Sequence, residues 1–359
     1  MTNEDPKIGP GESKNSGSVD RSPDPTRNDG IKYVSFQDAL QARKVNASSD
    51  WCKYDSDGPV APPGSALQRF NLGGFFKVEN KAKFKISRAE KVYTIGSCFA
   101  REIERALVFE GFNVPTSRVS IDPSYYRSPT RYLNTVLNKY NPYSMAYEIL
   151  RGLNRLTLID RGLIPVGDKW YDPSASHTDP LPRASVEILR DILDRVTEEV
   201  KTSSVFILTL GYTEAWFDTR TNVAFNGICT AMLRMIQNYL GFRNLRHSEC
   251  KAVLRDAFQE IKSQIPSAKI IVTVSPIPLT NTFTELDIVS ANTYSKSTLR
   301  SVAQELFEDL DYVDYFPSFE MVTASPRYET WFPDQVHVEE ETVRRVVKVF
   351  KERYLVRAE

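Results

Sequence analysis

A cysteine in the run Gly96-Ser97-Cys98 has the type and position of a nucleophile, because it follows a short β-type segment and begins an amphipathic one. At the first turn of a helix it would lie beside unpaired backbone N–H groups and the positive end of the helix dipole, which favour a thiolate and can bind an oxyanion. The sequence therefore predicts a reactive Cys98 with a thiol pKa below its ordinary value of about 8.5. The alternative is a tight turn in which Ser97 caps the helix and Cys98 packs as a small apolar side chain.

His337 is the candidate base, in the run DQVH that begins at Asp334. Imidazole titrates near neutral pH, and a carboxylate three residues earlier can orient the ring or lie beside it. His177 and His247 follow no predicted strand, so His337 is the strongest candidate of the three histidines. The alternative for His337 is an ordinary surface histidine near the start of a helix.

A glycine and several polar residues follow two further predicted strands. Gly211 permits close approach of the backbone to a substrate, and the threonine and glutamate after it supply a hydrogen-bond donor and an acceptor. Lys296, near the start of a predicted helix, can bind an anionic group or remain solvated. The candidate oxyanion and substrate contacts are Gly96, Gly211, Thr213, Glu214, Ser275, Asn292 and Lys296.

The elements that must position these residues alternate along the chain after residue 90. Short β-type runs are followed by amphipathic segments, as in parallel βαβ units. This pattern predicts a doubly wound, three-layer α/β/α sandwich with a mainly parallel sheet. Ligands of such sheets bind beyond the C-terminal ends of the strands. We expect strands at 92–95, 205–210, 270–274 and 312–316, and helices at 99–110, 186–196, 253–261, 299–306 and 343–350.

The first 90 residues differ from the rest of the chain. Residues 1–30 hold few apolar side chains among many Pro, Gly, Ser and charged residues, too few to offset the entropy of ordering, so a disordered tail is predicted. Residues 31–90 are irregular but carry aromatic side chains such as Trp51 and Phe84, which indicates a segment that wraps a domain. Residues 91–355 form the predicted catalytic domain.

Composition excludes several classes of protein. The 46 Lys and Arg residues balance 46 Asp and Glu residues across 359 positions, which gives no overall attraction to nucleic acid or anionic lipid. No apolar run approaches the ~20 residues of a membrane span, and the N-terminus shows no secretory signal, so we expect a cytoplasmic protein. The cysteines lie far apart and form no CxxC pair, which predicts reduced thiols with neither a zinc site nor a disulfide framework. We expect no metal and no cofactor. The cysteines are Cys52, Cys98, Cys229 and Cys250.

Taken together, several segments resemble the GSCFA family, which is named for the residues found here at 96–100. The resemblance runs from about Lys91 to about Phe350. It implies the SGNH, or GDSL-like, hydrolase superfamily, with a flavodoxin-like sheet, a nucleophile after the first strand and a DxxH motif near the C-terminus. The other matching segments are TLGYTEAW at 209–216, TVSPIPL at 273–279, ANTYSKSTLR at 291–300, YFPSFE at 315–320 and DQVH at 334–337.

Two departures from the superfamily pattern affect the expected chemistry. The first block, Gly-Asp-Ser, carries its nucleophile in third place, which falls on Cys98, while Ser97 replaces the Asp; both side chains are candidate nucleophiles. The third block, Gly-x-Asn-Asp, falls on 211–214, so Thr213 stands where an Asn would complete the oxyanion hole. Asn134 is a substitute donor, within a segment, YRSPTRYLNT, that resembles one in capsule-polysaccharide relatives.

These residues and the resemblance together predict an acyl-ester hydrolase that acts on an O-acylated carbohydrate or a related small ester. Cys98 or Ser97 would attack the carbonyl, His337 would shuttle the proton and Asp334 would assist it. One alternative is an O-acyltransferase of surface-polysaccharide biosynthesis, with an acyl donor such as acyl-CoA. The other is a domain that keeps the fold for binding a carbohydrate or a partner without turnover.

Overall fold

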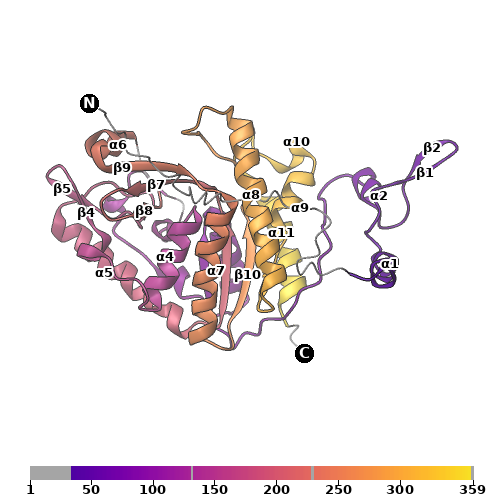
Figure 1. The fold of residues 1–359 in the computed structure, drawn as a ribbon, viewed down its shortest axis with the longest axis horizontal. Coiled ribbons are helices and arrows are strands. Elements are labelled where there is room, and N and C mark those ends of the chain that lie inside the picture. The colour runs from indigo at the N-terminus through magenta and orange to yellow at the C-terminus, as the bar shows by residue number, and fades with distance from the viewer. Residues whose placement is uncertain (1–33, 131, 228–229, 357–359) are drawn as a thin grey trace, which may run out of the picture.

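Four parallel strands form the central sheet of the described residues, 34–130, 132–227 and 230–356, in the computed structural model (Figure 1). The predicted tail at 1–30 and Cys229 lie outside these ranges. The strands are β3 (Val92–Gly96), β6 (Val205–Leu210), β10 (Lys269–Val274) and β11 (Val313–Tyr315), in the order β11-β10-β6-β3.

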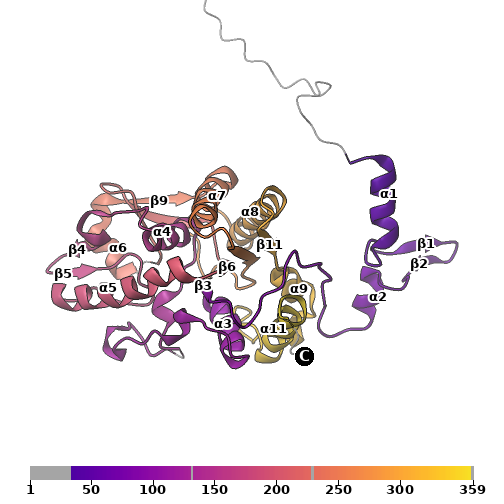
Figure 2. The ribbon, with the colours of Figure 1, turned by 90° about the horizontal axis from the view of Figure 1, so that it is seen from below.

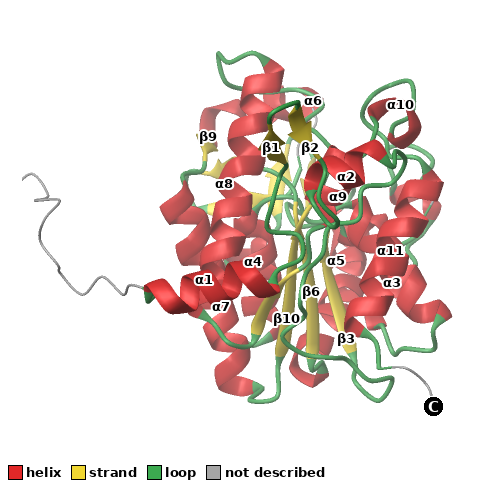
Figure 3. Ribbon diagram, turned by 90° about the vertical axis from the view of Figure 1, so that its right-hand side faces the viewer, coloured by secondary structure: helices red, strands yellow, loops and turns green. Residues whose placement is uncertain are grey.

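Helices cover both faces of this sheet, which confirms the predicted three-layer α/β/α architecture (Figure 3). On one face, side chains of β6 and β10 pack against α4 (Pro142–Gly152), α7 (His247–Gln264) and α8 (Ile288–Asp309). On the other face, they pack against α3 (Cys98–Phe109), α9 (Ser318–Ala324) and α11 (Glu340–Tyr354). Strand β6 is buried along its whole length because both faces are covered, which explains its continuous apolar sequence.

The order of the strands is that of a flavodoxin-like sheet without its second strand. In the place of that strand, Asn113 forms a single parallel bridge with Lys91 at the start of β3. The chain then runs through short 3-10 turns and α4 before it reaches α5 (Arg183–Thr197) and β6. Strand β3 is therefore an edge strand, and the segment before β6 crosses the end of the sheet.

The sequence did not predict the smaller elements around this core. An antiparallel sheet has the order β8-β7-β9, and β4 and β5 form a hairpin. Helix α8 begins at Ile288, after an Asp287 cap, so Lys296 lies inside the helix and not near its start. The bounds are β4 Ile164–Val166, β5 Lys169–Tyr171, β7 Glu214–Asp218, β8 Val223–Phe225, β9 Leu240–Asn244, α6 Thr230–Ile236 and α10 Arg327–Thr330.

The segment before β3 has two parts. Residues 34–74 contain elements where irregular chain was predicted, and they extend away from the α/β body (Figure 2). Residues 75–86 lie against the α11 side of the sheet, where Phe84 and Ile86 pack in the core and Ile86 bridges Leu355. The elements of the first part are α1 (Phe36–Val45), β1 (Lys53–Asp55), β2 (Gly58–Val60) and α2 (Ala66–Asn71).

Local sequence explains the two helices of this segment. Ser35 and Ser65 precede α1 and α2, and each side chain accepts a hydrogen bond from a backbone N–H of the first turn.

Among the described residues, none of the helices combines the length and the apolar character that a membrane span requires.

Candidate active site

A pocket opens at the C-terminal ends of the parallel strands, where ligands of such sheets bind. Residues that follow β3, β6 and β10 line it, including Cys98, Gly211 and Ser275. Its volume is about 2360 Å³, larger than the roughly 300–1,000 Å³ of a typical small-molecule site. The pocket therefore has room for a substrate of several rings or for two substrates.

The turn between β3 and α3 depends on Gly96. Its φ of 148° is rare for residues with a side chain, and a Cβ there would lie 2.7 Å from the Cβ of Thr209 on the neighbouring strand. This close approach lets α3 begin directly at Cys98, which is exposed in the pocket. Ser97 is only 3% exposed; its hydroxyl donates a 3.2 Å hydrogen bond to Ser275 and does not cap the helix.

The pKa of the Cys98 thiol is raised above its ordinary value, so the predicted lowering is wrong. Desolvation by the surrounding protein is the largest cause. Hydrogen bonds from the backbone N–H groups of Phe99 and Cys98, at the start of α3, oppose this effect but do not outweigh it. The helix terminus alone therefore does not make Cys98 a thiolate at neutral pH, and a base must remove its proton.

The Asp334–His337 pair lies in the tight loop before α11 and also lines the pocket. The Nδ1 atom of His337 is 2.7 Å from Oδ2 of Asp334, whose other oxygen accepts the backbone N–H groups of Val336 and His337. These hydrogen bonds lower the pKa of Asp334 to about 2, with the His337 ring as the largest cause. An ionised Asp334 favours the tautomer with the proton on Nδ1, which leaves Nε2 able to accept one.

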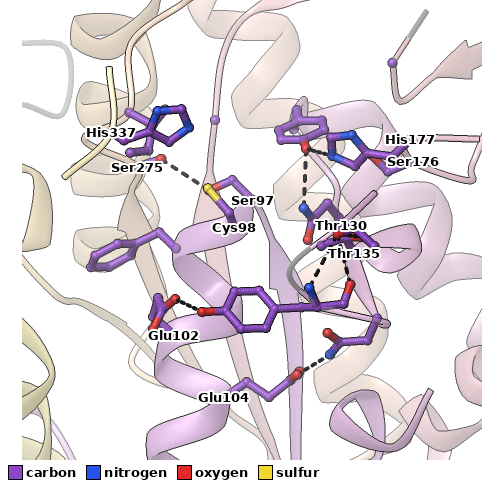
Figure 4. Close-up of a pocket in the computed structure, with 18 of the residues that line it drawn as sticks. Ser97, Cys98, Glu102, Glu104, Thr130, Thr135, Ser176, His177, Ser275 and His337 are labelled. Atoms are coloured by element: carbon purple, nitrogen blue, oxygen red, sulfur yellow. Dashed lines mark hydrogen bonds between the residues drawn. The ribbon is translucent and has the colours of Figure 1, made fainter. Parts of the chain in front are cut away.

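The two halves of the predicted catalytic pair thus share one pocket. Figure 4 draws His337, Ser275, Ser97 and Cys98 on one side of the view and His177 on the other. No hydrogen bond joins the Cys98 sulfur to the His337 ring in the part of the chain that the structure describes. Such contacts are often long in free enzymes and shorten when substrate binds.

Neither predicted side-chain donor for an oxyanion is available. Thr213 is fully buried and does not line the pocket, because its hydroxyl donates to Asn244 at 2.7 Å and its backbone N–H to Ser295 at 2.8 Å. Asn134 lines the pocket, but its amide nitrogen donates to Glu104 and to the carbonyl of Thr116. Both of its N–H groups are therefore engaged.

Glu214 and Asn292 hold the loop after β10 in place. Glu214 accepts hydrogen bonds from the Thr282 hydroxyl at 2.5 Å and from the Phe283 backbone N–H at 2.9 Å. Asn292 accepts the backbone N–H of Leu279 at 3.1 Å and does not itself line the pocket. These two predicted contacts therefore shape the wall of the pocket.

Lys296 is buried behind Gly211 and is not solvated. Only 3% of it is exposed, and its ammonium donates a 2.7 Å hydrogen bond to the Gly211 carbonyl. Burial lowers the pKa of Lys296 to about 7, while the nearby Cys98 opposes the change. Lys296 thus supports the strand end that lines the pocket and lies within electrostatic range of the sulfur.

Sequence reasoning missed a polar and aromatic group that faces Cys98 across the pocket. Tyr140 stacks on Tyr212 with ring centroids 5.5 Å apart, and its hydroxyl is 2.9 Å from Nε2 of His177. Burial, with a smaller contribution from Arg127, lowers the pKa of His177. A further side chain, Asn138, lies beside Tyr140 in the pocket.

The segment that carries this group is fixed between the ends of β3 and β6. The backbone N–H of Lys139 donates to the Gly96 carbonyl at 2.9 Å, and the Tyr140 carbonyl accepts the N–H groups of Gly211 and Tyr212 at 3.0 Å each. The segment follows no predicted strand and lies in the connection of nearly 100 residues between α3 and β6. Only its long-range hydrogen bonds show that it belongs to the pocket. The sequence signal for His177 was only that it is one of three histidines.

Metal ligands are not clustered in the described part of the chain, where no three His, Cys, Asp or Glu side chains converge on a common point. The chemistry available to the pocket from these residues is that of a thiol, two histidines, several carboxylates, and several amide and hydroxyl donors. This set suits nucleophilic acyl chemistry with general acid–base assistance.

Comparison with known proteins places the chain in a family. A solved structure, "Clostridium thermocellum family 3 carbohydrate esterase", is similar with a TM-score of 0.35 and 11% sequence identity, over 74% of this chain and 94% of that chain. No curated protein matches the chain. The model of the GSCFA family matches residues 91–350, which include the sheet, Cys98 and the Asp334–His337 pair. The chain belongs to the GSCFA family.

Proposed function

We propose that the protein is an acyl-ester hydrolase that forms a thioester on Cys98. The observation that carries the proposal is that one pocket holds both an accessible thiol at the start of α3 and a carboxylate-oriented imidazole. We propose residues 91–355 as the catalytic unit and the SGNH, or GDSL-like, superfamily as its wider placement. A nucleophile after β3 and a DxxH motif before α11 support that placement.

Cys98 is the proposed nucleophile in preference to Ser97. The sulfur is open to the pocket, whereas the Ser97 hydroxyl is buried and bonded to Ser275. A serine that attacks a substrate needs both access to it and contact with a base. Ser97 has no histidine partner among the described residues, so its support for the Gly-Ser-Cys turn is the role that fits.

The proposed reaction has two steps. In the first, Nε2 of His337 accepts the Cys98 proton, and the sulfur attacks the ester carbonyl. The carbon–oxygen bond to the alcohol then breaks, and the alcohol leaves with the proton from His337. In the second, His337 accepts a proton from water, which attacks the thioester; the carboxylic acid leaves and the thiol is restored. The raised pKa of Cys98 makes the base necessary in the first step.

An O-acylated carbohydrate is the proposed substrate class. Support comes from the size of the pocket and from its lining, in which aromatic rings stand beside amide and hydroxyl groups. The C–H bonds of a sugar ring carry a slight positive charge and pack well on the negative face of an aromatic ring. The polar neighbours, such as His177, supply partners for the sugar hydroxyls.

Acyl transfer is the second candidate, and the volume of the pocket favours it. A space of about 2360 Å³ can hold an acyl acceptor beside the thioester. In that case a hydroxyl of the acceptor replaces water in the second step, and acyl-CoA is the proposed class of donor. The two functions share the first step and the same nucleophile.

The test is the mass of the intact protein after brief exposure to p-nitrophenyl acetate or acetyl-CoA. We expect one acetyl group on the wild type and on Ser97→Ala, and none on Cys98→Ala. His337→Ala should acylate more slowly. Adding a sugar alcohol distinguishes transfer from hydrolysis, because transfer gives an acetylated sugar.

Two results would contradict the proposal. If the wild type gains no acetyl group from either donor, and releases p-nitrophenol at the rate of Cys98→Ala, the protein is not an acyl-ester enzyme; a binding domain would then be the better account. If the adduct survives in Cys98→Ala and is lost in Ser97→Ala, the assignment of the nucleophile is wrong.

A further inference from the structure

Asn138 has a buried amide with unused hydrogen-bonding capacity in the pocket. Its side chain is 1% exposed and lines the pocket. Its Oδ1 atom has no partner among the described residues, and its Nδ2 makes one long contact, 3.4 Å from the Tyr140 hydroxyl. An amide nitrogen carries two hydrogens, so whichever way the group is turned, at least one N–H is unused.

The backbone fixes the segment of Asn138 to the turn that precedes the nucleophile, and the amide and Cys98 line the same pocket. Lys139, the next residue, donates its N–H to the carbonyl of Gly96, two residues before Cys98. The backbone carbonyl of Asn138 accepts a hydrogen bond from the Asn226 side chain, which fixes the segment from its other side. Asn138 is therefore held at the Gly-Ser-Cys turn by main-chain contacts that do not involve its side chain.

Its amide is also oriented by its neighbours. The Tyr140 hydroxyl, which contacts Asn138, is 2.9 Å from Nε2 of His177, so a chain of polar groups runs from the amide to that histidine. Thr213 and Asn134, by contrast, already use their donors elsewhere. A buried amide N–H that lacks an acceptor destabilises the free protein, and a ligand oxygen in the pocket would supply that acceptor.

We propose that Asn138 is a catalytic residue that donates a hydrogen bond from its amide to the carbonyl oxygen under attack by Cys98. This inference rests on the proposed function. As the sulfur–carbon bond forms, the π electrons of the carbonyl move to its oxygen, and the amide stabilises that negative charge without transferring a proton. When the bond to the leaving alcohol breaks, the electrons return and the hydrogen bond weakens.

The experiment measures a tetrahedral adduct separately from the reactivity of the thiol. Acetaldehyde adds reversibly to a cysteine and gives a thiohemiacetal, whose oxygen occupies the place of the oxyanion. The rate of alkylation of Cys98 by iodoacetamide reports the free thiol, and its inhibition by acetaldehyde gives the dissociation constant of the adduct. The variants are Asn138→Ala and Asn138→Leu, the second of which keeps the volume of the amide. Asn80→Ala is the control, because Asn80 also has an unpaired amide but does not line the pocket.

We expect both Asn138 variants to raise the dissociation constant of the adduct at least about tenfold, as loss of one oxyanion donor does in other enzymes. Their uninhibited alkylation rates should stay within about twofold of the wild type, and Asn80→Ala should match the wild type in both measurements. The same variants should lose about 10²-fold in kcat with acetyl esters while KM changes little.

Two outcomes overturn the inference alone: no protection of wild-type Cys98 by acetaldehyde, or equal protection in the wild type and both Asn138 variants. Failure of Cys98 to react with iodoacetamide in the native wild type would instead remove the proposed nucleophile, and the role of Asn138 with it. If the adduct depends on Asn138 and no ester is turned over, Asn138 binds the oxygen of a Cys98 adduct, but the proposed hydrolysis falls and the catalytic role of Asn138 falls with it. A variant that fails to fold is recognised by its melting curve, and the other variant then decides.

Discussion

The Nδ1 of His337 donates a 2.7 Å hydrogen bond to Oδ2 of Asp334, within the pocket that also contains the Cys98 thiol. Three residues of a single loop therefore suffice to set the tautomer of the ring. The backbone N–H groups of Val336 and His337 hold the same carboxylate, so the ring and its partner are fixed together. This local arrangement explains how an exposed histidine can have a defined orientation.

Asp334→Asn should reduce kcat/KM for acetyl esters by about 10²-fold, less than the ~10⁴-fold loss known for a buried triad aspartate, because this pair is solvent-exposed. The amide cannot stabilise the imidazolium and permits the wrong tautomer. Steady-state kinetics checks this, with Gln335→Ala as a control in the same loop. An unchanged kcat/KM in Asp334→Asn would remove Asp334 from the mechanism.

The pH profile of the wild type should show no ionisation of Asp334 between pH 5 and 7. The pKa of Asp334 is about 2, below its ordinary value. Its carboxylate therefore stays ionised above about pH 4, and its effect on the ring is lost only as the pH falls toward 2. Any loss of wild-type activity between pH 5 and 7 must come from another group. If the wild-type activity shows an inflection between pH 5 and 7 that disappears in Asp334→Asn, this assignment is wrong.

Alkylation of Cys98 by iodoacetamide should show a midpoint above the ordinary thiol value of about 8.5, because desolvation by the surrounding protein raises the pKa of this thiol. The measurement uses a variant with Cys52→Ser and Cys229→Ser. The remaining thiol, Cys250, is fully buried with a pKa raised to about 12 and should not react in the native protein. A midpoint below 8.5 would show that the start of α3 or Lys296 outweighs desolvation.

Lys296→Met should stabilise the protein, most strongly below pH 7. The folded pKa of Lys296 is about 7 and the unfolded value is the ordinary 10.5. The folded state therefore loses the Lys296 proton at a lower pH than the unfolded state does. The cost of burying the charge is complete below pH 7 and disappears as the pH rises through 10.5. This difference corresponds to about 4–5 kcal/mol, from which loss of the hydrogen bond to Gly211 subtracts about 1 kcal/mol.

Urea unfolding at pH 6 and pH 9.5 measures this effect. The advantage of Lys296→Met over the wild type should shrink at the higher pH. Lys348→Met, on the exposed part of α11, is the control and should change stability by less than about 0.5 kcal/mol at both values. A variant that is less stable than the wild type at pH 6 would mean that the Lys296 charge is paired or hydrated in solution.

Gly96→Ala should destabilise the fold by about 3–5 kcal/mol, because it combines an unfavourable φ with a clash against Thr209 in the adjoining strand. Chemical denaturation measures the change. Gly227→Ala is the matched control, since a Cβ at Gly227 meets nothing within 4 Å and its φ is not in the left-handed region. Similar small losses in both variants would mean that β3 and β6 can separate at this turn.

Local patterns predicted the sheet and one half of the site. Strand β6 is a continuous apolar run because both of its faces are covered, and α3 follows directly on its glycine turn, so both could be located from the sequence. The Asp334–His337 pair could be predicted because its contacts span three residues. Lys296 was misplaced because α8 begins eight residues before it, although the Asp287 cap was a readable signal.

The other half of the site depends on contacts between distant parts of the chain. Asn138 and Tyr140 reach the pocket because their segment bonds to Gly96 and Gly211, which lie about 40 and 70 residues away in sequence. No periodicity of the sequence encodes such a placement. Thr213 was predicted to face the pocket from its alignment with an Asn, but it bonds instead to Asn244 and Ser295. The donor set of the pocket therefore had to be found in the structure.

The most direct test of the account is whether Cys98 and His337 can be joined by one short reagent. In 1,3-dichloroacetone the Cys98 sulfur displaces one chloride, and a nearby nucleophile displaces the second. Peptide mapping by mass spectrometry should find a bridge from Cys98 to His337 in the wild type and in His177→Ala, and no such bridge in His337→Ala. A bridge from Cys98 to His177 alone, with His337 unmodified, would contradict the proposed pair.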